Sequence, residues 1–272
     1  MAEVLFKIND VSFSYPNRPL VLDNVSFNIE SGESAAILGA NASGKSTLLH
    51  ILDGLYFPSS GSVSYCNNNI TEISVETPPF SSEFRQTVGF LFQNSDAQLF
   101  CQSVEEELEF GPLQLRLSID EVKSRVEDVF AWLEIEHLRK RSPQTLSGGE
   151  KKKVALASLL TMAPKVLLLD EPTSGLDPRT QHWLVELMQD LHQNGITLIT
   201  ASHDLSFVSE IAHRALVLSE DHKIVADAPV KDILNNLDLL LSVNLIHAHK
   251  HKHGTIEHEH PHMHETLHEH EH

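Results

Sequence analysis

Residues 39–46 read Gly39-Ala40-Asn41-Ala42-Ser43-Gly44-Lys45-Ser46 and match the pattern G-x-x-x-x-G-K-[ST] at every fixed position. The apolar run before them predicts a buried strand, and the residues from Thr47 onward predict a helix. In that setting backbone N–H groups point at a phosphate, and the helix dipole favours its negative charge. The sequence therefore predicts a phosphate-binding loop in which Lys45 reaches the β- and γ-phosphates of a nucleotide and Ser46 holds Mg²⁺.

The composition is that of a globular chain with a substantial core. Its 272 residues are 41% hydrophobic and 21% charged, and the formal net charge of -18 disfavours a large nucleic-acid or anionic-lipid footprint. We see no signal-peptide pattern at the N-terminus and no apolar run long enough to span a bilayer. Cys66 and Cys101 lack metal-like or redox-like spacing, which predicts free thiols in a reducing compartment.

The N-terminal third combines a strand pattern with turn signals. Val4, Phe6 and Ile8 alternate with polar residues, and the alternation resumes over 22–29. This period predicts an antiparallel layer that faces water on one side. The polar, proline-containing residues 67–82 predict a surface loop.

Residues from about 100 to 160 predict an inserted helical subdomain without strands. One helix is expected to begin near Glu105 and to stop before Gly111-Pro112. The helical spacing of Val122, Val126 and Val129 predicts a second.

Parallel-sheet character returns after residue 165. Continuous apolar runs at 166–169, 196–200 and 215–218 suit strands buried on both faces, with helices as right-handed crossovers. The expected fold class is α/β, with a P-loop NTPase (RecA-like) core and mixed or parallel sheet, an N-terminal antiparallel β layer and the inserted α-helical subdomain. We expect a nucleotide-binding domain over 1–229, a C-terminal helix over 230–246, and a histidine-rich tail over 247–272 that is disordered without a ligand.

Two carboxylates, Asp170 and Glu171, follow the apolar run 166–169. Ligands of open α/β sheets bind at the carboxyl ends of the strands. Asp170 there could complete the Mg²⁺ shell begun by Ser46, and Glu171 could polarise an attacking water. Two such carboxylates alone fit a solvated turn equally well, but the upstream phosphate loop favours the functional interpretation.

Residues 146–150 read Leu146-Ser147-Gly148-Gly149-Glu150. Ser147 and Glu150 form an S-x-x-E capping box, so the simplest interpretation is a well-capped helix. The two glycines also let an anion approach the N–H groups of the helix start. A helix start at 147–150 that binds phosphate does not easily reach the nucleotide that the loop 39–46 of the same chain binds.

Six motifs in a fixed order make the chain similar, from about residue 3 to 226, to the nucleotide-binding subunits of ATP-binding-cassette (ABC) transporters. The motifs are the phosphate loop 39–46, Gln93 after an apolar strand, the signature 146–150, the acidic strand 166–171, the loop 174–177 and His203.

The resemblance implies a role for each motif. Tyr15 would stack on adenine, and the catalytic residues would be Glu171 as general base, His203 as a contact to the γ-phosphate, and Lys45. Ser46, Gln93 and Asp170 would hold Mg²⁺. The nucleotide-binding residues that it implies are Tyr15, Gly39, Ala40, Asn41, Ala42, Ser43, Gly44, Lys45, Ser46, Thr47, Gln93, Ser147, Gly148, Gly149, Asp170 and Asp177.

In this family the signature faces the ATP of the opposite subunit. The resemblance therefore implies that hydrolysis needs two cassettes that sandwich two ATP molecules. The chain departs from the family pattern at three positions: Ala42 stands where many relatives have glycine, and Lys152 and Lys153 replace the usual glutamine and arginine. A lysine cannot make bidentate contacts like those of arginine, so we expect packing or pairing there to differ.

Residues 11–16, 93–100 and 104–112 resemble the energy-coupling-factor branch, whose importers take up vitamins or the metals cobalt and nickel. In that branch a glutamine such as Gln98 lies near the site that faces the membrane partner. The resemblance implies a peripheral protein at the cytoplasmic face of the cell membrane, bound to integral membrane subunits and to a second ATPase subunit. It implies no nucleic-acid partner.

The tail 247–272 holds eleven of the eighteen histidines. Neutral imidazole suits nickel, cobalt, copper and zinc alike, so composition does not choose among them. A solvated low-complexity segment and an expression tag are alternatives, although the interspersed glutamates and lysines argue against a tag. The predicted ligands of a transition metal are His247, His249, His251, His253, His258, His260, His262 and His264.

Our hypothesis from the sequence is the ATPase subunit of a nickel or cobalt importer. The first alternative is a vitamin importer of the same branch, with the tail as a metal buffer. The second is a soluble ABC ATPase outside transport, although such proteins usually carry two cassettes or a long coiled-coil insertion. A metal-storage protein fails to explain the six nucleotide motifs.

Overall fold

The computed structural model describes the backbone of residues 3–253 and 256–263, and the side chains of 3–246. A six-stranded sheet lies at its centre in the order β10-β9-β3-β8-β7-β6. The strands are β3 (Ser34–Leu38), β6 (Val88–Leu91), β7 (Val166–Asp170), β8 (Thr197–Ser202), β9 (Arg214–Leu218) and β10 (Ile224–Pro229). All are parallel except β10, which runs antiparallel to β9. The predicted α/β class with a mixed sheet is confirmed.

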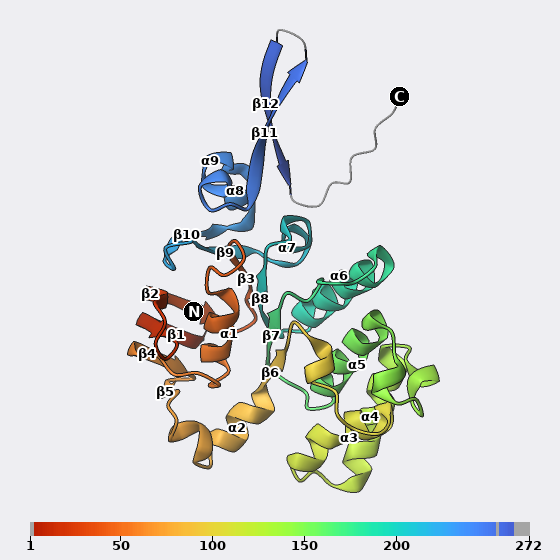
Figure 1. Ribbon diagram of the computed structural model, residues 1–272. Helices are drawn as coiled ribbons and strands as arrows, with labels where there is room; N and C mark the ends of the chain where they lie inside the picture. Colours follow the sequence, from red (N-terminus) through yellow and green to blue (C-terminus); the bar gives the residue numbers. More distant parts are fainter. Residues whose placement is uncertain (1–2, 254–255, 264–272) are drawn as a thin grey trace.

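A second, antiparallel layer precedes and follows the phosphate loop in sequence. It contains β1 (Val4–Ser14), β2 (Leu20–Glu30), β4 (Ser60–Tyr65) and β5 (Asn68–Asn69), in the order β2-β1-β4-β5. Helix α1 (Lys45–Leu52) lies between this layer and the central sheet, as Figure 1 shows. The apolar face of the layer, α1 and one face of the central sheet share a single hydrophobic cluster. The start of α1, and with it the phosphate loop, is thereby held from two sides.

Residues 67–82 are not wholly a loop. They contain β5, a 3₁₀ turn at Ser74–Glu76, and the beginning of α2 (Phe80–Thr87). Phe80 and Phe84 stack on α2 with their ring centroids 5.3 Å apart, and Phe84 is fully buried. An aromatic contact therefore anchors this short helix. The mostly polar composition of the segment gives no sign of that contact, which is why the sequence predicted a loop.

The helical part comprises α3 (Val104–Gln114), α4 (Ile119–Trp132) and α5 (Gly148–Leu160), with 3₁₀ turns at Glu136–Leu138 and Pro143–Thr145. The prediction that the first helix stops before Gly111-Pro112 is wrong, because α3 continues through both residues. Pro112 cannot donate a hydrogen bond to the Leu108 carbonyl. The Thr161 hydroxyl donates to that oxygen instead, at 3.0 Å. A distant side chain thus removes the usual cost of an internal proline.

The remaining helices follow β7. Helix α6 (Pro178–Gln193) and α7 (Leu205–Ile211) connect strands of the central sheet. The predicted single helix 230–246 is instead two short ones, α8 (Val230–Asn235) and α9 (Leu237–Ser242). Asn236 lies between them with φ −93° and ψ 80°, and its side chain accepts a hydrogen bond from the Leu239 N–H. This cap starts a new helix and explains the break.

The histidine-rich tail begins with an antiparallel pair, β11 (Ile246–His253) and β12 (Ile256–Met263). Figure 1 shows this hairpin extending beyond α8 and α9. The side chains of 247–272 lie outside the described residues, and so do the predicted metal contacts of the tail histidines. The expected disorder without a ligand stays a prediction.

One buried acid links α1 to α2. Asp53 directly follows α1, and burial raises the pKa of its carboxyl to about 7, although the Arg85 guanidinium partly lowers it. The two charged groups are 3.6 Å apart. The native state therefore binds this proton more tightly than the unfolded chain does.

We expect Asp53→Asn to raise the free energy of unfolding by up to about 4 kcal/mol at pH 8, because the pKa of the carboxyl is raised from 3.8 to about 7. A raised carboxyl pKa costs stability progressively as pH rises from about 4 to 7, and asparagine removes that cost without changing the shape. Chemical denaturation at pH 8 and pH 5 measures the effect, which should shrink by more than half at pH 5. A destabilised variant at pH 8 would contradict it.

Candidate active site

The phosphate loop connects β3 to α1 through backbone conformations that favour glycine. Gly44 has φ 113°, and an added Cβ would lie 2.5 Å from the Val21 carbonyl oxygen, so only glycine fits. Ala42, where relatives often have glycine, has φ 65°. A non-glycine residue in this left-handed region costs on the order of 1 kcal/mol, which the surrounding loop has to offset.

Lys45 is held across the loop. Its side chain is 5% exposed, and its Nζ donates hydrogen bonds to the carbonyls of Gly39 at 2.8 Å and Ala40 at 3.1 Å. The same Nζ lies 3.4 Å from Glu171 Oε1. A buried cation is therefore fixed where the loop N–H groups would meet phosphate oxygens.

Oxygen donors from two elements meet beside the loop. The Ser46 hydroxyl at the start of α1 donates to Asp170 Oδ1 at the end of β7, at 2.9 Å. Burial raises the pKa of the Asp170 carboxyl. The hydrogen bond from Ser46 partly lowers this pKa, and the neighbouring Glu171 charge raises it further. A hydroxyl and a carboxylate are ligands that Mg²⁺ accepts, and the metal keeps further positions for water and phosphates. Ser46 and Asp170 therefore fit the predicted ion.

Ser43 supplies a second test of the fit. Its buried hydroxyl has no hydrogen-bond partner among the described residues. A buried unpaired polar group is costly, and a phosphate oxygen bound in the loop is the kind of acceptor that would satisfy it. The loop therefore fits a nucleotide, whose phosphates supply the group that is transferred.

Glu171 contacts two other predicted site residues, Lys45 and His203. Its backbone has φ 42°, outside the strand that ends at Asp170. Its Oε2 lies 2.9 Å from His203 Nδ1 and accepts a hydrogen bond from the Ser202 hydroxyl at 3.4 Å. With Lys45 near Oε1, the carboxylate is oriented at both oxygens and is directed toward the loop. It can act on a water there as a general base.

A cavity of about 390 Å³ lies over the loop. Tyr15 forms one wall, and its hydroxyl is 3.0 Å from the Thr47 hydroxyl. The Tyr15 and Phe13 rings meet edge to face with their centroids 5.1 Å apart, which fixes the Tyr15 ring as a wall suited to a base. The lining residues are Tyr15, Arg18, Pro19, Leu20, Val21, Asn41, Ala42, Gly44, Lys45, Ser46, Thr47, Gln93, Glu171 and His222.

His222 was missed by the sequence reasoning. It lies in the turn between β9 and β10, and its Nδ1 is 3.1 Å from the Ser43 carbonyl oxygen. No motif surrounds it, so only the fold brings it to the phosphate loop. Its position in the cavity makes it a candidate contact for the nucleotide.

The signature lies elsewhere. Ser147 caps α5 in the predicted capping box with Glu150. Space is open beside Gly148, whereas a Cβ at Gly149 would lie 3.0 Å from the Thr180 hydroxyl. Asp177 caps α6 through the N–H groups of the next turn. Among the described residues that line the cavity, none belongs to the signature or to the loop 174–177.

Lys152 is a second buried cation near the site. Its Nζ donates to the Gln93 carbonyl at 3.0 Å and to the Phe92 carbonyl at 3.4 Å. Burial lowers the pKa of Lys152 to about 8, and the Asp170 carboxylate partly counteracts this. Lys152 replaces the family's usual glutamine, yet it ties α5 to the segment that carries Gln93. Lys153 instead lies over the Trp183 ring, with Nζ 4.5 Å from its centroid.

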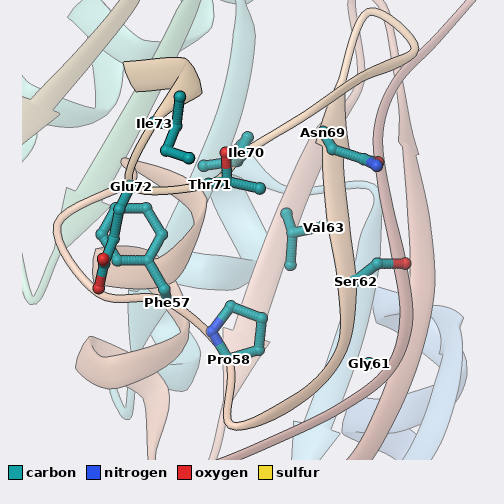
Figure 2. A pocket seen from close by; sticks show the side chains of 10 residues that line it. All are labelled: Phe57, Pro58, Gly61, Ser62, Val63, Asn69, Ile70, Thr71, Glu72 and Ile73. Carbon is teal, nitrogen blue, oxygen red and sulfur yellow. The ribbon is translucent and has the colours of Figure 1, made fainter. Parts of the chain in front are cut away.

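Another cavity, of about 470 Å³, lies beside β4 at the edge of the antiparallel layer. Figure 2 shows it between the Phe57-Pro58 turn and residues 69–73. Its one ionisable lining residue is Glu72, and none of the predicted site residues lines it. This cavity therefore has no link to the predicted nucleotide site.

Comparison with known proteins settles the family. The sequence profile of the ABC transporter family matches residues 22–174. A protein of Methanosarcina acetivorans described as an ABC transporter ATP-binding protein is 52% identical over 98% of both chains. The chain belongs to the ABC transporter family. As an ABC cassette it is an ATPase, and ATP is its nucleotide.

Further relatives include members of the predicted branch. The nickel import ATP-binding protein NikO of Rhodobacter capsulatus is 43% identical over 89% of this chain and 95% of its own. The energy-coupling factor transporter ATP-binding protein EcfA of Methanococcus maripaludis is 36% identical over 89% and 85%. One of these relatives is named for nickel import and the other for the energy-coupling factor, so the resemblance to ABC transporter ATPases of that branch is confirmed.

Solved structures agree with the cassette fold. The structure of cbiO1 from Clostridium perfringens, part of the ABC transporter complex cbiONQ, matches with a TM-score of 0.76 and 34% identity over 89% of this chain and 95% of its own. An ATP-binding cassette solved as a dimer in a post-hydrolysis state with ADP and Pi matches with a TM-score of 0.74 and 26% identity over 83% and 99%.

The first site prediction concerns Glu171, whose role as general base stays a proposal. We expect Glu171→Gln to lower the ATPase rate by at least about 100-fold, because an amide cannot accept the proton of the attacking water. ATP binding should persist and should trap cassette dimers, measured by size-exclusion chromatography with ATP and Mg²⁺. Turnover close to that of the wild type would show that another group is the base.

The second concerns Lys152. Lys152→Met should lower the ATPase rate about tenfold, because the carbonyls of Phe92 and Gln93 lose their donor and the segment that carries Gln93 loses its anchor. Lys152→Gln should stay within about threefold of the wild type, since its amide can donate to the same carbonyls. Lys153→Met is the matched control and should change the rate little. Equal rates for Lys152→Met and the wild type would refute the anchoring role.

Proposed function

We propose that this ABC cassette is the ATP-hydrolysing subunit that powers import of a transition metal ion, nickel or cobalt, through membrane partner subunits. The observation that carries the proposal is the likeness to NikO over nearly the whole cassette, joined to a histidine-rich tail. The relative EcfA favours a second candidate, a vitamin importer of the same branch. In that case the tail would buffer metal rather than serve the transported solute.

Hydrolysis in this proposal needs two cassettes. Within one chain the cavity is lined by the predicted base, the lysine and two of the predicted Mg²⁺ ligands, Ser46 and Gln93, but its lining lacks the signature residues. The start of α5 offers open space at Gly148 and the positive end of the helix dipole. A second cassette, identical or not, supplies that helix start to the ATP of the first.

A groove of about 820 Å³ between α2 and the helical part suits the membrane partner. Gln98, which the sequence singled out for this role, lines the groove, and the Phe100 and Phe110 rings meet edge to face with centroids 4.8 Å apart. Phe100 is 62% exposed, which is unusual for a large aromatic side chain. Arg85 and Arg116 also line the groove. The occupant we propose is an apolar segment of a membrane subunit that presents an acidic group to these arginines.

Glu107 gives the groove a fixed wall. Its carboxylate is buried and accepts hydrogen bonds through Oε2 from the N–H groups of Phe100 at 2.9 Å and Cys101 at 2.8 Å. Glu107 belongs to the stretch 104–112 that resembles the energy-coupling-factor branch. Its fixed loop holds Phe100 at the surface, where a partner can reach it.

In this proposal the protein is attached to the membrane through its partner subunits. Within the described residues, none of the helices is both long enough and apolar enough to cross a bilayer. We place the protein at the cytoplasmic face of the membrane as a peripheral subunit.

The tail supports a metal over a vitamin. The relative from Methanosarcina aligns over 98% of this chain, so residues of that relative stand opposite most of the tail. An expression tag would have no counterpart there. Imidazoles are good ligands for nickel and cobalt, and a vitamin does not require them.

Purification from detergent-solubilised membranes tests the function. We expect the chain to copurify with integral membrane subunits. After reconstitution in vesicles, the complex should take up radioactive Ni²⁺ or Co²⁺ only with ATP, and the Glu171→Gln complex should take up none. Uptake of a vitamin without either metal would favour the second candidate. Recovery of the chain alone or with ribosomes would contradict a transport function.

A further inference from the structure

The register of the tail hairpin places histidine opposite histidine. The three facing pairs, here called the histidine rungs, are His247–His262, His249–His260 and His251–His258. Successive residues of a strand alternate between its two faces, and residues directly opposite each other share a face. The six histidine positions therefore occupy one face of a two-stranded ribbon.

The other face carries opposite charges in the same register. Lys250 stands opposite Glu259, and Lys252 stands opposite Glu257. Opposite charges at directly facing positions favour a register by roughly 0.2–1 kcal/mol per pair. The lysines and glutamates between the histidines thus favour the strand register that places the histidines opposite one another.

The numbering of the histidines fits this register independently. They stand at odd positions over 247–253 and at even positions over 258–264, and the two strands that carry them are separated by two residues, 254 and 255. A slip of one residue would place the histidines of one strand on the face opposite those of the other. Strands separated by two residues pair odd with even positions, which brings the histidines of the two described strands to one face.

We propose that the histidine rungs are transition-metal sites, each of which offers two imidazoles, one per strand, to one divalent ion such as Ni²⁺ or Co²⁺. Directly facing positions have Cβ atoms about 4.5–5.5 Å apart, a spacing that lets two imidazoles reach one ion at about 2.0–2.1 Å. The remaining ligands are water or groups of a delivering or receiving molecule. The inference rests on the proposed metal role of the tail for its biological purpose, but its test measures binding alone.

Two properties follow from this arrangement. An ion that bridges the strands stabilises their pairing, so binding and hairpin formation are coupled. Binding also needs neutral imidazole, whose ordinary pKa is about 6.5, and it therefore weakens as pH falls from 7.5 to 5.5.

Calorimetric titration of the full chain with Ni²⁺ tests the proposal against a composition-matched variant. The variant exchanges neighbours within one strand, His249→Lys with Lys250→His and His251→Lys with Lys252→His. It keeps every histidine but moves two of them to the face of Glu257 and Glu259. We expect the wild type to bind about three ions on the histidine rungs and the exchanged variant to lose about two, or to bind them at least tenfold more weakly.

Two further chains complete the experiment. Exchange of one charge pair, Lys250→Glu with Glu259→Lys, keeps the histidine rungs and should bind Ni²⁺ like the wild type. A chain that ends at Ile246 should lose the tail sites altogether, and thermal melting followed by circular dichroism checks that each variant is folded. Equal binding by the wild type and the histidine-exchanged variant would overturn the proposal, because composition alone would then hold the metal. If the reconstituted complex takes up no metal but the histidine rungs still bind Ni²⁺, the proposed function is refuted and the proposed metal sites are not.

Discussion

Lys45 is a buried cation in the phosphate loop, and much of the site offsets the cost of burying its charge. Lys45 satisfies its ammonium group with two loop carbonyls and the Glu171 carboxylate. Because a buried cation without partners is prohibitively costly, these contacts also define where Glu171 can lie. Ser202 at the end of β8 and His203 directly after it contact the same carboxylate, so the proposed base is oriented from both sides.

The charges near the site balance as a group. Lys152 and Lys45 both act on Asp170, which lies beside Glu171 at the end of β7. Two buried cations thus stand against two carboxylates. Phosphates of a bound nucleotide add negative charge that this balanced set does not neutralise. The Mg²⁺ expected at Ser46 and Asp170, and the positive end of a second cassette's α5, are the sources that could do so. This charge balance is compatible with a site that closes between two chains.

The sequence revealed the parts of this site that depend on local backbone geometry. A glycine-rich loop between a strand and a helix, and carboxylates at the end of a buried strand, are patterns within single segments. Parts that depend on distant contacts were missed. In the sequence, Lys152 stands out only as a departure from the family pattern. Neither its contact with the Gln93 segment nor the position of His222 beside the loop has a local signal. The same limit explains α3, where the donor that lets the helix pass Pro112 is Thr161, 53 residues away from Leu108.

The tail presents the opposite situation, because its pattern is local, whereas the proposed metal binding would couple its structure to a ligand. An isolated two-stranded hairpin is marginal in water, and its two cross-strand charge pairs add little to that. The expected disorder without a ligand and the paired strands of the structure are therefore compatible, because the tail can exist in an equilibrium between an unpaired and a paired state. A metal ion that binds two facing histidines adds free energy only to the paired end. On this argument the tail is paired when metal is plentiful and open when it is scarce, so its folded fraction would report the metal concentration at the face of the transporter.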